Sequence, residues 1–161
     1  GLVALVVLAV VWFRRPRWFR ASARVVDGDS LRIQGHAVRL AGIDAPEHNQ
    51  VGVSRGQTVR LGREATQAMR RLIGEGTVSY RLLSVDRYGR MLAVVRNQQG
   101  QDVGRELVRQ GWAVAYGYQT RRQARRYWWV QLTARLARRG MWGMCAKVSP
   151  AAWRMANPRK G

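Results

Sequence analysis

The sequence predicts an α+β fold in which a small closed barrel of five β-strands is combined with about three helices. Three observations lead to this prediction. Short apolar runs separated by turn residues fill 23–43, a second pair of such runs fills 77–97, and helix-forming segments follow each group. With 161 residues, 47% of them hydrophobic, the chain can build one core but not two of ordinary size.

The first group of runs predicts three strands and a helix. Residues 23–33, ARVVDGDSLRI, are typical of two strands joined at an Asp-Gly turn, and residues 36–43 continue as a third strand after a Gln-Gly turn. Helical spacing of apolar residues then predicts the first helix at 57–73. The residues with this spacing are Ala65, Met69, Leu72 and Ile73.

The second half predicts a hairpin and two further helices. Residues 77–85 and 90–97 are expected to be strands on either side of the turn DRYG. A short helix is expected within 102–113, with Asp102 as its N-cap, and a longer one at 121–139. Three residues of the longer helix are predicted to pack on the core: Trp129, Leu132 and Leu136. Five strands in this arrangement favour an OB-fold-like barrel, the oligonucleotide-binding type.

The charge of the chain points to a polyanionic partner. There are 29 basic and nine acidic residues, giving a formal net charge of +20, and only Lys147 and Lys160 among the basic residues are lysines. Arginine forms paired hydrogen bonds to phosphate, which suits nucleic acid, although a GC-rich genome also favours arginine. No acidic residue follows Glu106, so the last third is a cationic surface for nucleic acid or anionic lipid. The single cysteine, Cys145, excludes an intrachain disulfide.

Residues 1–21 combine an apolar run, LVALVVLAVVWF, with an Arg-rich flank, RRPRWFR. The run is shorter than the roughly 20 residues that span a bilayer, and its arginines follow it, whereas those of a secretory signal precede the apolar core. We expect a membrane anchor, and a cleaved signal or a helix packed on the domain are the alternatives. The protein is accordingly predicted to be membrane-anchored, with secretion or the cell envelope as the alternative.

Acidic residues gather in one short window of this basic chain. Asp27 and Asp29 flank the first turn, and Asp44 and Glu47 end the third strand. Four carboxylates close together repel one another unless a cation lies among them, and hard divalent cations prefer carboxylate and carbonyl oxygens. If the first and third strands are neighbours in the barrel, both acidic groups meet at one rim. A plain hairpin turn is the alternative for the Asp-Gly pair alone.

Two arginines add a phosphate-binding element to these acids. Arg39 lies in the strand that leads to Asp44, and Arg90 follows the second hairpin turn. A cation and guanidinium groups can take the charge that develops on phosphorus, and a carboxylate can orient or deprotonate water. The combination indicates phosphodiester hydrolysis.

Several separated motifs resemble those of the staphylococcal nuclease (thermonuclease) family. They are VVDGDSLRI, VRLAGIDAPE, DRYGR, ELVRQGWAVAY and MWG, in family order between about residues 22 and 143. The resemblance implies a five-stranded barrel with three helices and a calcium-dependent nuclease. Such an enzyme acts on DNA and RNA with low sequence specificity and leaves 3′-phosphate products.

The resemblance also implies roles for individual residues. Asp29, Asp44 and the backbone carbonyl of Ala45 correspond to the calcium ligands, with Asp27 supporting them. Glu47 corresponds to the general base, and Arg39 and Arg90 to the pair that holds the scissile phosphate. The positions that correspond to further substrate contacts are Arg87, Tyr88, Tyr116 and Tyr118.

The sequence thus divides into a segment at 1–21, a nuclease-like domain at 22–143 and a basic tail at 144–161 that we expect to be peripheral. We predict a monomer with DNA or RNA as its partner. One alternative is a non-catalytic OB-fold module that binds nucleic acid and is tethered to a membrane. Another is a structural protein whose cationic face binds lipid.

Overall fold

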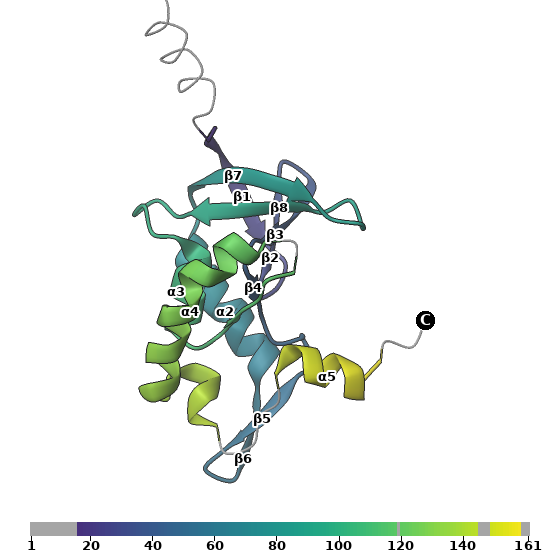
Figure 1. Ribbon diagram of the computed structural model, residues 1–161, viewed down its shortest axis with the longest axis vertical. Helices are drawn as coiled ribbons and strands as arrows, with labels where there is room; N and C mark the ends of the chain where they lie inside the picture. The colour runs from purple at the N-terminus through teal and green to yellow at the C-terminus, as the bar shows by residue number, and fades with distance from the viewer. Residues whose placement is uncertain (1–15, 119, 145–148, 159–161) are drawn as a thin grey trace, which may run out of the picture.

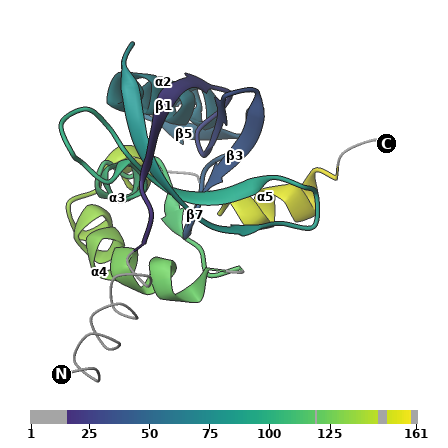
Figure 2. The ribbon, with the colours of Figure 1, turned by 90° about the horizontal axis from the view of Figure 1, so that it is seen from above.

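The computed structural model describes residues 16–118, 120–144 and 149–158 and confirms the α+β prediction. Five strands form a closed barrel in the order β1-β2-β3-β8-β7 (Figures 1 and 2). Neighbouring strands are antiparallel except for β3 and β8, which run parallel. The barrel strands are β1 (Phe19–Val25), β2 (Ser30–Ile33), β3 (His36–Leu40), β7 (Thr77–Val85) and β8 (Met91–Arg96).

Two short ribbons lie outside the barrel. β4 (Ile43–Asp44) pairs with β9 (Val114–Ala115), and β5 (Val51–Ser54) pairs with β6 (Gln57–Arg60). The β4–β9 ribbon connects the end of the third barrel strand to the segment before the longest helix, and Tyr116 N–H donates to the Gly42 carbonyl at 2.9 Å. Residues 70 or more positions apart in sequence thereby share one edge of the barrel.

Helices cover one end and side of the barrel (Figure 1). They are α2 (Leu61–Ile73), α3 (Val103–Arg109), α4 (Arg121–Leu136), the 3₁₀ turn η1 (Gly140–Gly143) and α5 (Pro150–Ala156). The part of the chain that the structure describes therefore has four α-helices rather than about three, and α5 is the unexpected one.

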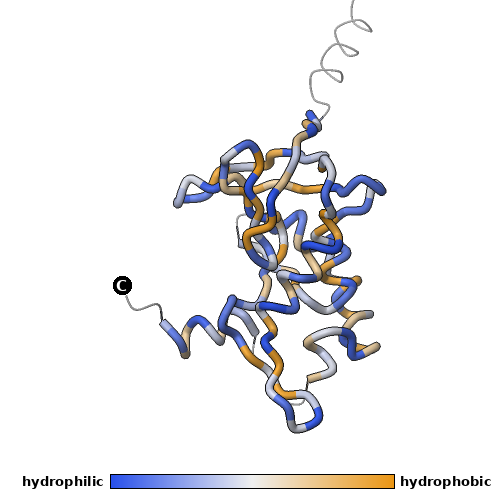
Figure 3. The backbone as a smooth tube through the Cα atoms, turned by 180° about the vertical axis from the view of Figure 1, so that it is seen from behind, coloured by the Kyte–Doolittle hydropathy of each residue, from blue (hydrophilic) through white to orange (hydrophobic). Residues whose placement is uncertain are grey.

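The core lies between the barrel interior and α2. Apolar residues at alternate positions of β2 and β3 point into the barrel. Because α2 adds small and flexible side chains to this core, the sheet and the helix approach each other closely. Buried contributors include Leu31, Val38 and Leu40 of the strands and Ala65, Ala68 and Met69 of the helix. Figure 3 shows hydrophobic stretches along the barrel strands and hydrophilic ones at the hairpin tips.

The first predicted helix begins later than expected. Residues 57–60 form β6 instead, paired with β5 across a turn in which Arg55 and Gly56 have φ angles of 49° and 76°. Two consecutive positive φ values are typical of a two-residue hairpin turn, and Gly56 supplies one of them without strain. Helical periodicity therefore starts only at Leu61.

The face that α4 buries differs from the predicted one. Trp129 and Leu136 are 68% and 78% exposed, whereas Gln123, Tyr127 and Ala134 are buried. The Tyr127 hydroxyl lies 2.8 Å from both carboxylate oxygens of Asp102 and accepts from Gln123 Nε2 at 2.6 Å. Because of this buried polar network, the face of α4 that packs on the domain contains Tyr127 and not the tryptophans.

Asp102 is confirmed as the N-cap of α3, because its carboxylate accepts from the Arg105 backbone N–H at 3.1 Å. The same carboxylate binds Tyr127 of α4, so one side chain joins the two helices.

The predicted anchor lies mostly outside the described residues, as do Cys145 and Lys147. Within the described ranges, no helix has both the length and the apolar character needed to cross a bilayer. Membrane attachment and localisation stay predictions.

Tyr127→Phe is expected to reduce the free energy of unfolding by about 1–3 kcal/mol, because Asp102 and Gln123 would lose their buried partner. Urea denaturation followed by tryptophan fluorescence measures this change. Tyr88→Phe is the matched control, since Tyr88 is 68% exposed, and it should leave the unfolding midpoint unchanged. Equal midpoints for the two variants would contradict the structural role of the network.

Candidate active site

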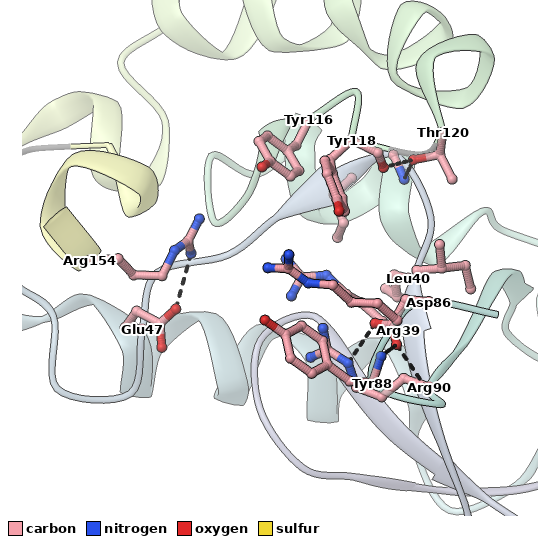
Figure 4. Close-up of a pocket in the computed structure, with 14 residues that line it drawn as sticks. Arg39, Leu40, Glu47, Asp86, Tyr88, Arg90, Tyr116, Tyr118, Thr120 and Arg154 are labelled. Carbon is pink, nitrogen blue, oxygen red and sulfur yellow. Dashed lines mark hydrogen bonds and ion pairs between the residues drawn. The ribbon is translucent and has the colours of Figure 1, made fainter. Parts of the chain in front are cut away.

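One pocket of about 570 Å³ gathers most of the side chains singled out in the sequence (Figure 4). It opens beside the ends of β3 and β8 and the segment between β9 and α4. The predicted site residues that line it are Arg39, Glu47, Arg87, Tyr88, Arg90, Tyr116 and Tyr118. Substrate-contacting candidates from four separate stretches of sequence therefore share one cavity.

Asp29 and Asp44 converge on a single guanidinium. Arg39 Nη2 lies 3.2 Å from Asp29 Oδ2 and 2.8 Å from Asp44 Oδ1. The pairing of β2 with β3 produces this geometry, because Ser30 is opposite Arg39 and the Leu40 N–H donates to the Asp29 carbonyl at 2.9 Å. The acids meet as predicted, although the first and third strands are not neighbours and β2 lies between them.

Both converging carboxylates are withdrawn from water. Asp29 is 7% and Asp44 is 1% exposed, and burial raises the pKa of each. For Asp29, the charge of Arg39 and hydrogen bonds from Ala45 N–H (3.1 Å) and the Ser30 hydroxyl (3.0 Å) only partly oppose this effect. The site thus holds negative charge at a free-energy cost that an additional cation would relieve.

Asp27 supports this cluster from the β1–β2 turn. Its Oδ1 accepts from the Asp29 backbone N–H at 3.3 Å, and its charge adds to the raised pKa of Asp29. The turn packs tightly on the domain, because a Cβ at Gly28 would lie 2.8 Å from Ala65 and 2.9 Å from Ala45. Only glycine allows α2 to approach the acids this closely.

Glu47 lines the pocket and is anchored through its backbone. Its N–H donates to the Gln50 side chain at 3.2 Å, and its carbonyl accepts from Gln50 N–H at 2.8 Å. A side chain at Gly62 in the first turn of α2 would collide with the Glu47 carbonyl oxygen, so the helix start is fitted to this loop.

The donor set fits a hard divalent cation only in part. Asp29 and Asp44 reach the same nitrogen of Arg39, so their oxygens point into one small volume. Nowhere in the described ranges do three or more His, Cys, Asp or Glu side chains form a group that could hold a metal. A cation here would take two carboxylates and complete its coordination with carbonyl and water oxygens, which calcium accepts.

Arg90 is held in the pocket wall by Asp86. Arg90 Nε lies 2.8 Å from Asp86 Oδ2, and Asp86 Oδ1 accepts from the backbone N–H groups of Tyr88 (2.9 Å) and Arg90 (3.0 Å). Burial of Asp86 opposes ionisation, but these hydrogen bonds outweigh it and lower the pKa of Asp86. The carboxylate therefore stays ionised and keeps the guanidinium in place.

Aromatic rings face one another across the cavity. Tyr116 and Tyr118 stack with centroids 6.3 Å apart and lie opposite Tyr88, whose ring is flanked by the guanidinium groups of Arg87 (4.8 Å) and Arg90 (5.4 Å) (Figure 4). All three tyrosines are substantially exposed. Such rings can stack on nucleobases of any sequence.

Sequence reasoning gave no role to Arg154, which the structure places in this pocket. Arg154 comes from α5 and contacts both Asp44 and Glu47. A single arginine among so many carries no signal in sequence, because the contact joins residues 110 positions apart.

Comparison with known proteins agrees with this geometry. The family model described as "Staphylococcal nuclease homologue" matches residues 37–144, more than half of the chain. The chain belongs to the staphylococcal nuclease family. The matched residues include Arg39, Asp44, Glu47, Arg90 and the tyrosines of the pocket, and they end before α5.

Several relatives of this staphylococcal nuclease homologue carry nuclease names. An uncharacterized endonuclease of Escherichia coli O157:H7 is 33% identical over 81% of each chain. A micrococcal nuclease of Shigella flexneri is 30% identical over 98% of this chain and 94% of its own length. An uncharacterized endonuclease of Haemophilus influenzae is 31% identical over 81% of this chain and 70% of its own.

Asp29→Asn is expected to stabilise the metal-free nuclease at neutral pH. The pKa of Asp29 is higher in the folded state than in the unfolded state. The stabilisation that its protonated form contributes is therefore complete below the unfolded-state pKa and is lost as the pH rises through the folded-state pKa. Removing the charge should raise the free energy of unfolding at pH 7, and the gain should vanish near about pH 4, where the carboxyl of Asp29 is protonated in the folded state. Urea denaturation with chelator at both pH values measures it.

Asp86→Asn is the control with the opposite sign. The pKa of Asp86 is lowered, so its stabilising effect is present above the unfolded pKa and is lost as the pH falls through the folded pKa. This variant should be less stable than the parent at pH 7. A destabilised Asp29→Asn protein would mean that the Arg39 ion pair outweighs the cost of burial.

Proposed function

We propose that this nuclease is a calcium-dependent endonuclease that hydrolyses phosphodiester bonds of DNA and RNA with low sequence specificity and leaves 3′-phosphate products. The observation that carries the proposal is the convergence of Asp29, Asp44 and Arg39 at the edge of a pocket lined by Glu47 and Arg90.

Asp29, Asp44 and the carbonyl of Ala45 would hold the calcium ion, with Asp27 beside them. When bound, the ion supplies positive charge to the phosphate oxygens and to a coordinated water molecule. Two buried carboxylates with raised pKa values support this assignment, because a divalent cation compensates their charge where water cannot.

Arg39 and Arg90 would hold the scissile phosphate from two sides. Arg39 is held through Nη2 by two carboxylates, and Arg90 is held through Nε by one. Both guanidinium groups line the cavity. Preorganised guanidinium groups stabilise the charge that grows on the phosphoryl oxygens as water attacks.

Glu47 would accept the proton of the attacking water. The new P–O bond forms as the bond from phosphorus to the 5′ oxygen breaks, and that oxygen leaves as a hydroxyl after taking up a proton. Glu47 lines the pocket and shares the guanidinium of Arg154 with Asp44, and this closeness to the proposed metal ligand supports the role.

Low sequence specificity would follow from how the remaining wall is built. Tyr88, Tyr116 and Tyr118 offer ring faces, and Arg87 offers charge. Stacking and phosphate contacts are available to every nucleotide and therefore select for none. The overall charge of +20 would concentrate nucleic acid near the site and make binding salt-dependent.

The non-catalytic binding module is the weaker alternative. A protein that only bound nucleic acid would gain nothing from two buried carboxylates, which repel phosphate and cost stability. Relatives that are named endonucleases also favour catalysis.

The decisive measurement is cleavage of single-stranded DNA and RNA by the full chain, with added calcium and then with excess chelator. We expect cleavage that stops on chelation and returns with calcium, with 3′-phosphate ends on the products. Glu47→Gln should bind the same oligonucleotide but not cut it. Cleavage that persists in chelator would overturn the metal-dependent mechanism.

Arg39→Lys is expected to reduce kcat/KM on the order of 10²-fold, because lysine cannot reproduce the planar fork. Steady-state kinetics on a short oligonucleotide measures the change. Arg63→Lys is a matched control, since Arg63 is exposed on α2 and takes no part in the pocket. A similar loss in both variants would indicate a general charge effect rather than a specific phosphate contact.

A further inference from the structure

The strongest unassigned contact in the described residues is made by α5. Arg154 Nη2 lies 2.8 Å from Asp44 Oδ2, and Nη1 lies 3.2 Å from Asp44 Oδ1 and 3.0 Å from Glu47 Oε1. One guanidinium thus binds both oxygens of the proposed calcium ligand and one oxygen of the proposed base. Arg154 lies beyond residue 144, where the family match ends.

We propose that α5 is an internal inhibitor, in which Arg154 takes the place of the divalent cation and blocks the site until metal and nucleic acid displace it. This inference rests on the proposed function, since it assumes that Asp44 binds the metal. Docking of α5 and binding of the cation are then mutually exclusive.

Competition for the same electron pairs is the physical reason. A hard cation must bind a carboxylate oxygen of Asp44 directly, but Oδ1 already accepts from Arg39 and Arg154, and Oδ2 accepts from Arg154. A divalent ion placed on Asp44, which is itself shielded from water, would also meet the positive charge of this guanidinium.

A role for Arg154 as a third phosphate ligand fits the contacts less well. Both terminal nitrogens of Arg154 bind protein carboxylates, whereas the ion pairs of Arg39 and of Arg90 each use one nitrogen. A phosphate-binding arginine needs its paired N–H groups directed at the ligand. In this arrangement the fork of Arg154 is directed at Asp44.

The helix is built to present this side chain while burying little surface. Ser149 caps α5 by accepting from the Ala152 N–H at 3.1 Å, and Pro150 opens the first turn. Pro150 is the only buried residue of α5, Met155 is 85% exposed, and Figures 1 and 2 show the helix projecting to one side of the barrel.

Polar contacts therefore dominate the attachment of α5. Besides the ion pairs of Arg154, the Trp153 Nε1–H group donates to Asn49 Oδ1 at 3.4 Å. Within the described residues α5 buries little apolar surface, so loss of the Asp44 contact weakens its attachment and makes displacement by a tightly bound cation feasible.

The test compares the full chain with its Arg154→Ala variant by isothermal titration with calcium alone, without nucleic acid. We expect calcium to bind about tenfold more tightly to the variant, because no competitor has to be displaced. Arg71→Ala is the control, since this arginine is exposed at the end of α2, and its calcium affinity should equal that of the parent.

Hydrogen exchange gives a second readout that does not depend on catalysis. Calcium should accelerate amide exchange within 150–156 of the parent, whereas in Arg154→Ala exchange there should already be fast and insensitive to calcium. Cleavage should rise in the variant at low calcium and match the parent at saturating calcium.

Equal calcium affinity in parent and variant, with amide hydrogen exchange of α5 unaffected by calcium, would overturn the proposal that α5 is an inhibitor. A raised KM for oligonucleotide in Arg154→Ala with unchanged calcium affinity would do the same and would make Arg154 a substrate ligand. If neither protein binds a divalent cation or shows chelator-sensitive cleavage, the proposed function itself fails, and the inhibitor with it.

Discussion

The sharing of Arg39 by Asp29 and Asp44 is the interaction on which the site depends. Two carboxylates cannot both be buried beside each other without a compensating cation, and Arg39 reaches both from one strand. The β2–β3 register sets the position of Arg39, and the turn at Gly28 allows α2 to pack next to the acids. A shift of one residue in that register would turn Arg39 to the opposite face and leave the acids uncompensated.

The fold joins the acidic edge to the rest of the pocket through two unusual pairings. The parallel contact between β3 and β8 places the hairpin turn that carries Arg90 beside Arg39, and the β4–β9 ribbon brings Tyr116 next to the end of β3. The arginines, the acidic residues and the tyrosines of the site thus come from segments that meet only in the closed barrel. The same buried acids are expected to lower stability, which is a common compromise at functional sites.

A strongly cationic chain can supply its own counter-ion to an acidic site. Arg154 does so in this structure, and its guanidinium stays protonated at any pH where the protein functions, so a rise in pH does not release it. While Asp44 stays ionised, relief of the contact must come from a competing cation or a competing polyanion. The basic character of the chain then bears on control of the site as well as on attraction of nucleic acid.

Local signals in the sequence determined the barrel strands, the turns between them, the Asp102 cap and the grouping of four acids in one window, because alternation, capping and turn formation act over a few residues. The motifs were also sufficient for the family. Tertiary structure alone decided which face of α4 is buried and where Arg154 lies. Those outcomes depend on contacts between distant residues, such as Tyr127 with Asp102 and Arg154 with Asp44, and a sequence pattern does not encode which distant partners meet.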